Sequence, residues 1–185
     1  MKEKRTPRYH VVWVIGIAVL LLGVAWGGVS EVRTMGRMCL FSAVQGVVTE
    51  GGKPVAGAWV EHRFEWAWNQ SRGVERTRTD DAGRFHFDAV WGRSLLGALL
   101  PHEPAVEQSI WIEHAGRRYP AWQFTRANYA EQSELFGRPI ELACDLGLQP
   151  RTYVLEHDHV QHHIYGLCVI KGIRDPAAHL AHPEA

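Results

Sequence analysis

Nineteen consecutive residues without a charge, residues 11–29, constrain this chain more than any other feature of its sequence. An α-helix of that length is about 28 Å long, close to the ~30 Å thickness of the hydrocarbon core of a bilayer. Trp13 and Trp26 lie near the two ends of the run, where indole rings favour the headgroup region. The run therefore predicts a single transmembrane helix.

The charges on either side of this run predict its orientation. Lys or Arg occupies positions 2, 4, 5 and 8 before the run, whereas only Arg33 and Arg37 follow it closely. The positive-inside rule then places residues 1–10 in the cytoplasm and the body of the chain in the periplasm. A cleaved signal peptide is the alternative, although its apolar region is usually about 7–15 residues long. We expect a single-pass protein of the bacterial inner membrane.

The charge balance argues against nucleic-acid binding. Lys plus Arg and Asp plus Glu each number 20, and no basic stretch is interleaved with aromatic residues. The length of the chain suits one domain with its own hydrophobic core. We expect a stalk at residues 30–38, one domain at residues 39–170 and a flexible tail at residues 171–185.

Apolar residues alternate with polar ones through much of the expected domain. Every second residue from 58 to 68 falls on one face (Ala, Val, His, Phe, Trp, Trp), while Trp59, Glu61, Arg63 and Glu65 share the other. Such alternation is typical of a half-buried antiparallel strand. Helical character is confined to residues 94–100, with one more turn at 128–135. The pattern predicts an all-β antiparallel sandwich of about seven strands. Strands are expected near residues 44–48, 58–68, 76–79, 84–87, 109–114, 118–124 and 140–145, and at 152–169 in one or two pieces.

Three sequence segments resemble a known domain family. Residues 46–48, 52–60 and 79–87 are GVV, GKPVAGAWV and TDDAGRFHF. This resembles the carboxypeptidase-regulatory-like, or transthyretin-like, sandwich, in which G-x-P-(V/L)-x-G-A-x-V is followed by T-(D/N)-x-x-G-x-(F/Y). The resemblance implies a prealbumin-like antiparallel sandwich. Residues 38–42 and 99–104 resemble a group of small bacterial exported proteins with this domain, and that narrower resemblance implies no activity.

No catalytic constellation emerges from the sequence. Transthyretin-like folds include hydroxyisourate hydrolases, whose chains end in Tyr-Arg-Gly-Ser, whereas this chain ends in His-Pro-Glu-Ala. We therefore expect a non-enzymatic domain that binds a protein partner. Exposed aromatic side chains make good interface anchors, and the candidates are Trp59, Trp66, Trp68 and Trp91.

The densest group of potential metal ligands is the tract EHDHVQHH at residues 156–163. In one continuous strand, His157, His159 and His163 would share a face and could hold a transition metal. The structural alternative is a solvated edge strand or loop that has no metal function. No other cofactor is indicated. His62, on the apolar face of its strand, is expected to be a core histidine that hydrogen-bonds to the backbone.

Three cysteines in an exported chain predict one disulfide and one free thiol. The pairs are Cys39–Cys144, Cys39–Cys168 and Cys144–Cys168. The last joins two strand-like segments through a short loop, and we favour it.

The expected role is an immunity or accessory protein, tethered to the membrane, that captures a periplasmic toxin or effector. The small size, the tether and the abundant aromatic residues motivate this hypothesis. Two alternatives are a structural module of an envelope complex, and a metal-binding protein that uses the histidine tract.

Overall fold

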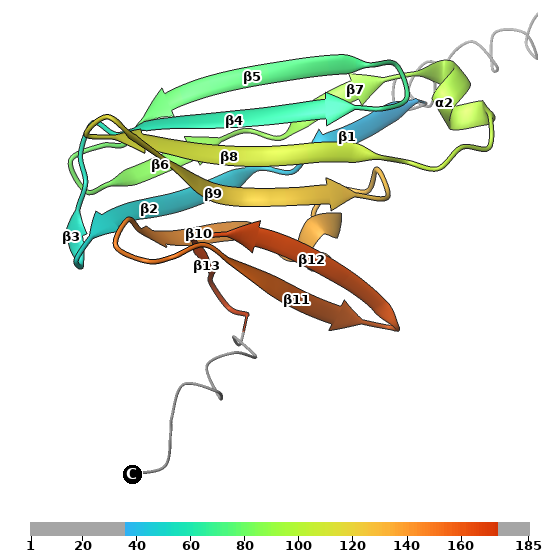
Figure 1. The fold of residues 1–185 in the computed structure, drawn as a ribbon. Coiled ribbons are helices and arrows are strands. Elements are labelled where there is room, and N and C mark those ends of the chain that lie inside the picture. The colour runs from blue at the N-terminus through green and yellow to red at the C-terminus, as the bar shows by residue number, and fades with distance from the viewer. Residues whose placement is uncertain (1–35, 174–185) are drawn as a thin grey trace, which may run out of the picture.

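The computed structural model describes residues 36–173 and shows an all-β sandwich. One layer is a six-stranded antiparallel sheet in the order β11-β12-β9-β8-β4-β5, drawn across the upper and right-hand parts of Figure 1. Its strands are β4 (Trp59–Trp66), β5 (Ser71–Arg78), β8 (Val106–His114), β9 (Arg117–Arg126), β11 (Arg151–His157) and β12 (Val160–Gly166).

The second layer is a five-stranded sheet in the order β13-β10-β2-β3, with β6 also paired to β2. Strands β10 and β2 are parallel, whereas the other pairs are antiparallel. Strand β1 pairs with β7 in a separate two-stranded ladder. This ladder continues the β2–β6 ladder, because β1 leads directly into β2 and β6 leads directly into β7. The strands are β1 (Arg37–Phe41), β2 (Val44–Glu50), β3 (Lys53–Pro54), β6 (Arg84–Phe87), β7 (Val90–Arg93), β10 (Ile140–Asp145) and β13 (Val169–Ile170).

The hydrophobic core lies between the two layers, as the alternation predicted for residues 58–68. On β4, Val60, His62 and Trp66 are buried, whereas Trp59 and Arg63 of the opposite face are exposed. The main cluster contains apolar residues of both layers. A smaller cluster at one end contains Met38, Leu40, Trp66 and Val106, and it includes the start of β1, which lies inside the expected stalk.

The described residues contain thirteen strands rather than about seven. Of the two forms expected for residues 152–169, the structure has the divided one, because residues 158–159 form a tight turn between β11 and β12. Strand β13 follows as a separate short strand. Strand β5 extends well beyond residues 76–79. It is an edge strand, and most of its residues are exposed, so its sequence SRGVERTR carries no apolar alternation.

The two helical predictions are confirmed as short elements. Helix α2 (Leu95–Leu99) begins after Ser94, whose hydroxyl accepts a hydrogen bond from the backbone N–H of Gly97. A single turn of 3-10 helix, η1 (Ser133–Leu135), follows β9. The predicted anchor at residues 11–29 and the basic segment before it lie outside the described residues. Within residues 36–173, no helix is both long and apolar enough to cross a membrane.

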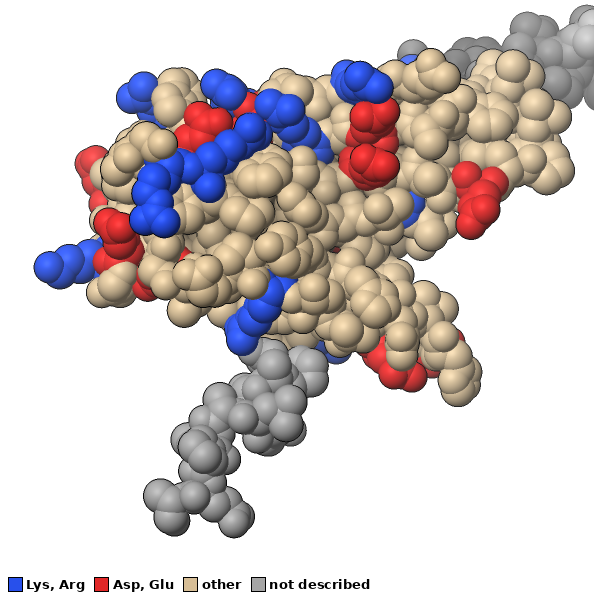
Figure 2. All heavy atoms as spheres, viewed as in Figure 1, with Lys and Arg blue, Asp and Glu red and all other residues tan. Residues whose placement is uncertain are grey.

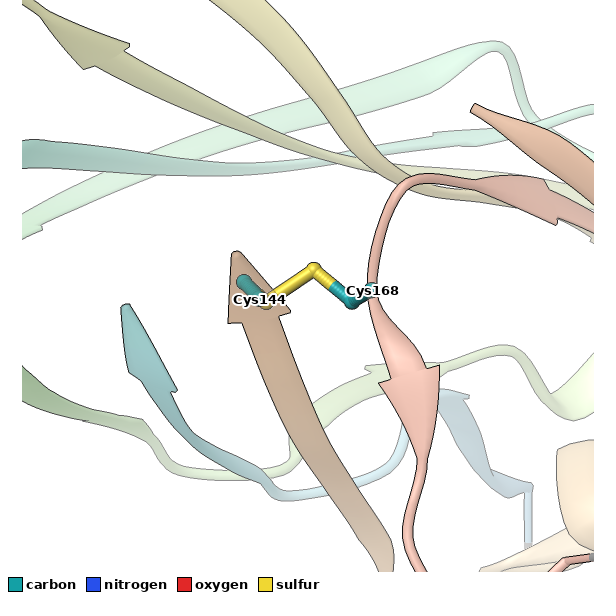
Figure 3. The surroundings of a disulfide bond; sticks show 2 residues. All are labelled: Cys144 and Cys168. Carbon is teal, nitrogen blue, oxygen red and sulfur yellow. A yellow bond between two sulfur atoms is a disulfide. The ribbon is translucent and has the colours of Figure 1, made fainter. Parts of the chain in front are cut away.

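A disulfide joins Cys144 of β10 to Cys168, just after β12 (Figure 3). This is the pair that the sequence favours, and Cys39 is the free, buried thiol. The backbone N–H of Leu167 donates to the carbonyl of Pro120 in β9 (2.9 Å). The disulfide therefore fastens the second layer to the segment that leaves the six-stranded sheet.

We expect the C144S/C168S variant to lose about 3 kcal/mol of unfolding free energy. The bridge closes a loop with a sequence separation of 24 residues, and cross-links of that span restrict the unfolded chain by about this amount. Urea titrations with and without reductant measure the effect. The wild-type protein should shift to the variant's midpoint on reduction, whereas the variant should not respond. A reductant-sensitive variant would contradict this assignment.

Candidate functional site

The histidine tract does not form the predicted metal site. Because the turn at residues 158–159 reverses the chain, His157 pairs with Val160 and His163 pairs with Val154. His159 lies in the turn with a φ of 65°. Across the ladder, His157 shares a face with His162, whereas His163 is on the opposite face. The three predicted ligands therefore do not converge, and residues 36–173 contain no group of three or more His, Cys, Asp or Glu side chains that could hold a metal ion.

Two histidines of the tract have a packing role instead. The ring of Phe136 stacks on His162 with centroids 4.2 Å apart and contacts His157 at 5.2 Å. His162 Nδ1 lies 2.9 Å from the carbonyl oxygen of Glu134, which accepts a hydrogen bond from it in the Nδ1–H tautomer. These contacts hold the β11–β12 hairpin, which projects at the lower right of Figure 1, against the segment after β9.

The four predicted partner-binding tryptophans have different environments. Trp66 is only 1% exposed and donates from its indole N–H to the Tyr129 hydroxyl (2.9 Å), so it is a core residue and cannot anchor a partner. Trp68 is half-buried beneath α2, and Trp91 is half-buried beneath the guanidinium of Arg37. Trp59 is 39% exposed and is the one of the four on the outer face of the six-stranded sheet.

A buried polar network occupies one end of the core. Arg126 and Glu134 are both fully buried and form an ion pair at 2.9 Å. The Glu134 carboxylate also accepts hydrogen bonds from the backbone N–H (3.1 Å) and hydroxyl (2.7 Å) of Ser42 and from the side-chain amide of Gln108 (2.8 Å). The Arg126 guanidinium also donates to the carbonyls of Asn128 and Ala130. The charges are paired and closed to solvent, so this network is structural.

The free thiol of Cys39 belongs to the same network. Arg126 Nη1 donates to Cys39 Sγ (3.3 Å). Burial raises the pKa of this thiol above its ordinary value, and the nearby charge of Arg126 only partly offsets that rise. Cys39 is therefore a neutral, inaccessible thiol at physiological pH, which is unsuited to nucleophilic chemistry.

His62 is the core histidine that the sequence predicted, but without the expected hydrogen bond at Nε2. Its ring lies between Phe41 and Phe87, with centroids 4.0 and 4.9 Å away. Burial lowers the pKa of His62 to about 4, and Nε2 has no hydrogen-bond partner. The residue is neutral at physiological pH and acts as an aromatic core side chain.

A cluster of charged side chains centres on Glu61, on the outer face of the six-stranded sheet in β4, next to the edge strand β5. Arg76 of the neighbouring strand β5 donates from Nε to Glu61 Oε2 (2.7 Å), and Arg118 of β9 donates from Nη2 to Oε1 (2.8 Å). Arg63, two residues along β4, also pairs with this carboxylate. Although Glu61 points away from the core, it is only 1% exposed, because the three arginines cover it.

Desolvation tends to raise the pKa of Glu61, but hydrogen bonds from Arg63 and Arg76 and their positive charges outweigh it. The pKa is therefore held below its ordinary value. Glu61 remains ionised at physiological pH and fixes the positions of the arginines around it.

Two exposed arginines of this face stack on aromatic rings. The Arg78 guanidinium lies 4.2 Å from the ring centroid of Trp59, and that of Arg118 lies 4.5 Å from the centroid of Trp111. Trp111 is paired directly with Glu61 across β4 and β8. Figure 2 shows the Lys and Arg atoms gathered at the end of the molecule where β4 begins and β5 ends. We call Trp59, Arg76, Arg78, Trp111 and Arg118 the Arg/Trp face.

A groove of about 600 Å³ lies on the same side of the sheet, next to the Arg/Trp face. It crosses β5, β4, β8 and β9 and reaches His163 of β12. Its lining is mixed in polarity and includes Arg63, Arg72, Val74, Glu107, Gln123 and His163. The groove and the Arg/Trp face together give this side of the sheet a concave, partly aromatic surface.

The sequence pattern predicts Trp59 as an exposed anchor but does not predict the rest of this surface. The alternation places Trp59 and Glu61 on the same side of β4, and that signal was available. The arginines come from β5 and β9, however, and only strand pairing brings them to Glu61.

Comparison with known proteins identifies one family. The family model described as "Domain of unknown function (DUF6795)" matches residues 44–149, more than half of the chain. The matched segment runs from β2 to the connection after β10, so it contains the whole of the Arg/Trp face. No curated protein and no solved structure matches the chain.

We expect Glu61→Gln to lower the unfolding free energy by about 1–2 kcal/mol at neutral pH, because it removes the charge from hydrogen bonds with arginines. The pKa of Glu61 in the folded protein lies below its ordinary value of 4.5. The contribution of the charge is therefore complete above about pH 4.5 and is lost as the pH falls through the lower folded value. Urea unfolding of both proteins across this range should show the difference shrinking with acidification.

Glu65→Gln is the matched control, because Glu65 lies on the same face of β4 and pairs only with the exposed Arg72 (2.9 Å). Its unfolding free energy should change by less than about 1 kcal/mol. Burial is the cause of the lowered pKa of His62, so we expect its contribution to be the same in all three proteins and to cancel from the comparison. A pH-independent effect of Glu61→Gln would contradict the electrostatic role.

We expect Arg126→Met to lower the unfolding free energy by about 3–5 kcal/mol, because it leaves the Glu134 carboxylate buried without its cation. The R126M/E134Q double variant should lose less than the sum of the two single variants. Thermal or urea unfolding of the four proteins measures this coupling. Additive losses would show that the two side chains contribute independently.

Proposed function

Since the chain belongs to the DUF6795 family of domains of unknown function, we propose a function from its own surface: it is a non-enzymatic, membrane-anchored module whose six-stranded sheet binds a protein partner through its outer face. Residues 11–29 are the anchor, and the sandwich lies on the periplasmic side of the bacterial inner membrane. The observation that carries this proposal is the Arg/Trp face, which is open, aromatic and organised around one buried carboxylate.

The composition of this face suits protein recognition. Trp and Arg are the residues most enriched among the side chains that dominate binding energy at interfaces. Trp59 is exposed, and Arg78 covers part of its ring without burying it. Because Glu61 and the tryptophan rings already hold the arginines in place, a partner would lose little side-chain entropy when it binds them.

The charges of this face favour an acidic partner surface. Arg76, Arg78 and Arg118 lie on it, while Glu61 is buried and Glu113 is half-buried between Arg76 and Arg118 (3.8 and 3.7 Å). A carboxylate of the partner can replace the water around these guanidinium groups and accept paired hydrogen bonds from them.

Two features support export of the domain. The uncharged run of residues 11–29 is preceded by basic residues, as expected for an anchor with a cytoplasmic N-terminus. The Cys144–Cys168 disulfide suits an oxidising compartment such as the periplasm.

We also propose that the sandwich is of the transthyretin-like, carboxypeptidase-regulatory-like type. The two parts of the motif lie in the β2–β3–β4 segment and in the connection from β5 to β6. Gly57 and Gly83 of the motif have φ values of 72° and 74°. A Cβ at Gly83 would lie 2.3 Å from the carbonyl oxygen of Val48, so this position requires glycine.

The test is affinity capture of the tagged full-length protein from the membranes of its own host, followed by mass spectrometry. The W59A/W111A variant should recover at least about tenfold less partner than the wild type, because hot-spot side chains contribute about 2 kcal/mol each. Leu148→Ala is the matched control, because Leu148 is 47% exposed and lies after β10, away from the Arg/Trp face.

The identity of the captured protein decides the biological role. A stoichiometric secreted toxin or effector would make this an immunity or accessory protein, and subunits of an envelope complex would make it an assembly module. Equal capture by the wild type and W59A/W111A would contradict the assignment of the Arg/Trp face.

A further inference from the structure

An apolar surface, distinct from the Arg/Trp face, lies at the opposite end of the domain from the start of β4. Helix α2 and the residue after it carry four leucines that are more than half exposed: Leu95 (60%), Leu96 (63%), Leu99 (64%) and Leu100 (51%). The buried residue of the helix is Gly97. The helix thus directs its smallest residue to the domain and its leucines to the outside, which is the reverse of an ordinary surface helix.

Hydrogen bonds and ring contacts attach the leucine tip (Leu95, Leu96, Leu99 and Leu100) to the rest of the domain. The Ser94 hydroxyl accepts hydrogen bonds from the Gly97 backbone N–H (2.9 Å) and from the Trp68 indole N–H (2.8 Å). The ring of His102 packs at a tilt against Trp68, with centroids 4.2 Å apart. Its Nδ1 and Nε2 lie within hydrogen-bond distance of the Leu100 carbonyl and the Tyr129 hydroxyl. The leucines are therefore presented by a fixed scaffold, and their exposure is a property of the fold.

The chain enters the domain beside this tip. The backbone N–H of Ser94 donates to the carbonyl of Gly36 (2.9 Å), and β1 then pairs with β7, the strand that leads into α2. Figure 1 shows the start of β1 and α2 together at the right-hand end of the molecule. Six residues lie between Gly36 and Val29, the end of the apolar run, so the two are at most about 25 Å apart along the chain.

Basic and aromatic side chains flank the leucines. Arg37 and Arg93 are directly paired across β1 and β7, and both are exposed. The Arg37 guanidinium lies 3.8 Å from the centroid of the Trp91 ring. Leucines that enter the acyl boundary, with Arg and Trp at the level of the headgroups, are the composition that interfacial helices use.

We infer that Leu95, Leu96, Leu99 and Leu100 dock onto the outer surface of the bilayer in which residues 11–29 are anchored. This inference rests on the anchor of the proposed function. With one end of the domain against the lipid, the Arg/Trp face is directed to the side and away from the membrane, where a periplasmic partner can reach it.

The test uses the full-length chain reconstituted in vesicles of phosphatidylethanolamine and phosphatidylglycerol. An environment-sensitive fluorophore is attached to Leu99→Cys or, as a matched control, to Leu148→Cys in the connection between β10 and β11. Cys39 is buried and the other two cysteines are joined, so the introduced thiol is the one that reacts. Emission at position 99 should shift to the blue and be quenched by spin-labelled lipids severalfold more than emission at position 148.

Three results would overturn the inference. If the protein floats with the vesicles but shows equal, weak quenching at both positions, the anchor is supported and the docking of the leucines is contradicted. Blue-shifted emission that spin-labelled lipids do not quench would mean that a protein surface, such as a second copy, covers the tip. Failure to float with the vesicles would remove the anchor and the docking together.

A second variant separates docking from mere proximity. L95S/L96S removes half of the leucines and leaves Ser94, Gly97 and their contacts unchanged. In the chain labelled at position 99, it should reduce quenching by spin-labelled lipids severalfold, because the driving force scales with apolar area. Unchanged quenching would show that the anchor alone sets the position of the tip, and would also overturn the inference.

Discussion

The buried ion pair between Arg126 and Glu134 connects several separate parts of this domain. Glu134 receives hydrogen bonds from Ser42 between β1 and β2 and from Gln108 of β8, while Arg126 at the end of β9 binds the carbonyls of the loop that follows. The backbone carbonyl of Glu134 lies within hydrogen-bond distance of His162 Nδ1 in β12. Both layers therefore meet at the Glu134 carboxylate, and the β11–β12 hairpin contacts the backbone of the same residue. A buried charge is tolerated only when every partner is present, so this interaction favours a single arrangement of the strands.

On the opposite side of the six-stranded sheet, Glu61 is likewise a carboxylate paired with arginine, but it lies at the surface rather than in the core. Both carboxylates are almost wholly buried, but Glu134 is surrounded by the core and Glu61 by arginines that remain partly open to solvent. The first arrangement stabilises the fold and offers nothing to a ligand. The second holds guanidinium groups and indole rings in a fixed pattern at the surface, which is why the proposed binding function rests there. Docking of the leucine tip on the bilayer would fix the orientation of the domain relative to the membrane and leave the Arg/Trp face accessible.

Predictions from the sequence are correct where a local pattern decides the structure and wrong where a turn or a strand pairing decides it. The alternation along β4 correctly separated Val60 and His62 from Trp59 and Arg63, because the side-chain period of a strand is two. The same rule placed Trp66 on the core face, yet Trp66 was also expected to bind a partner, and its burial rules that out. For the histidine tract, the same two-residue period was assumed to continue through residues 158–159, where the chain in fact reverses direction. One tight turn put His157 and His163 on opposite faces, and no periodicity within the tract announced that turn.

By itself, the sequence determined that the body of this chain is an all-β sandwich, that Cys144 and Cys168 are the favoured disulfide pair, and that one long apolar run precedes the domain. These conclusions follow from patterns between near neighbours in the chain. Only the tertiary structure decided which side chains form the Arg/Trp face, that Arg126 and Glu134 pair in the core, and that four leucines of α2 remain outside it. Strand pairing joins residues such as Glu61 and Arg118, which are 57 positions apart, and the register that joins them depends on the packing of the whole sheet.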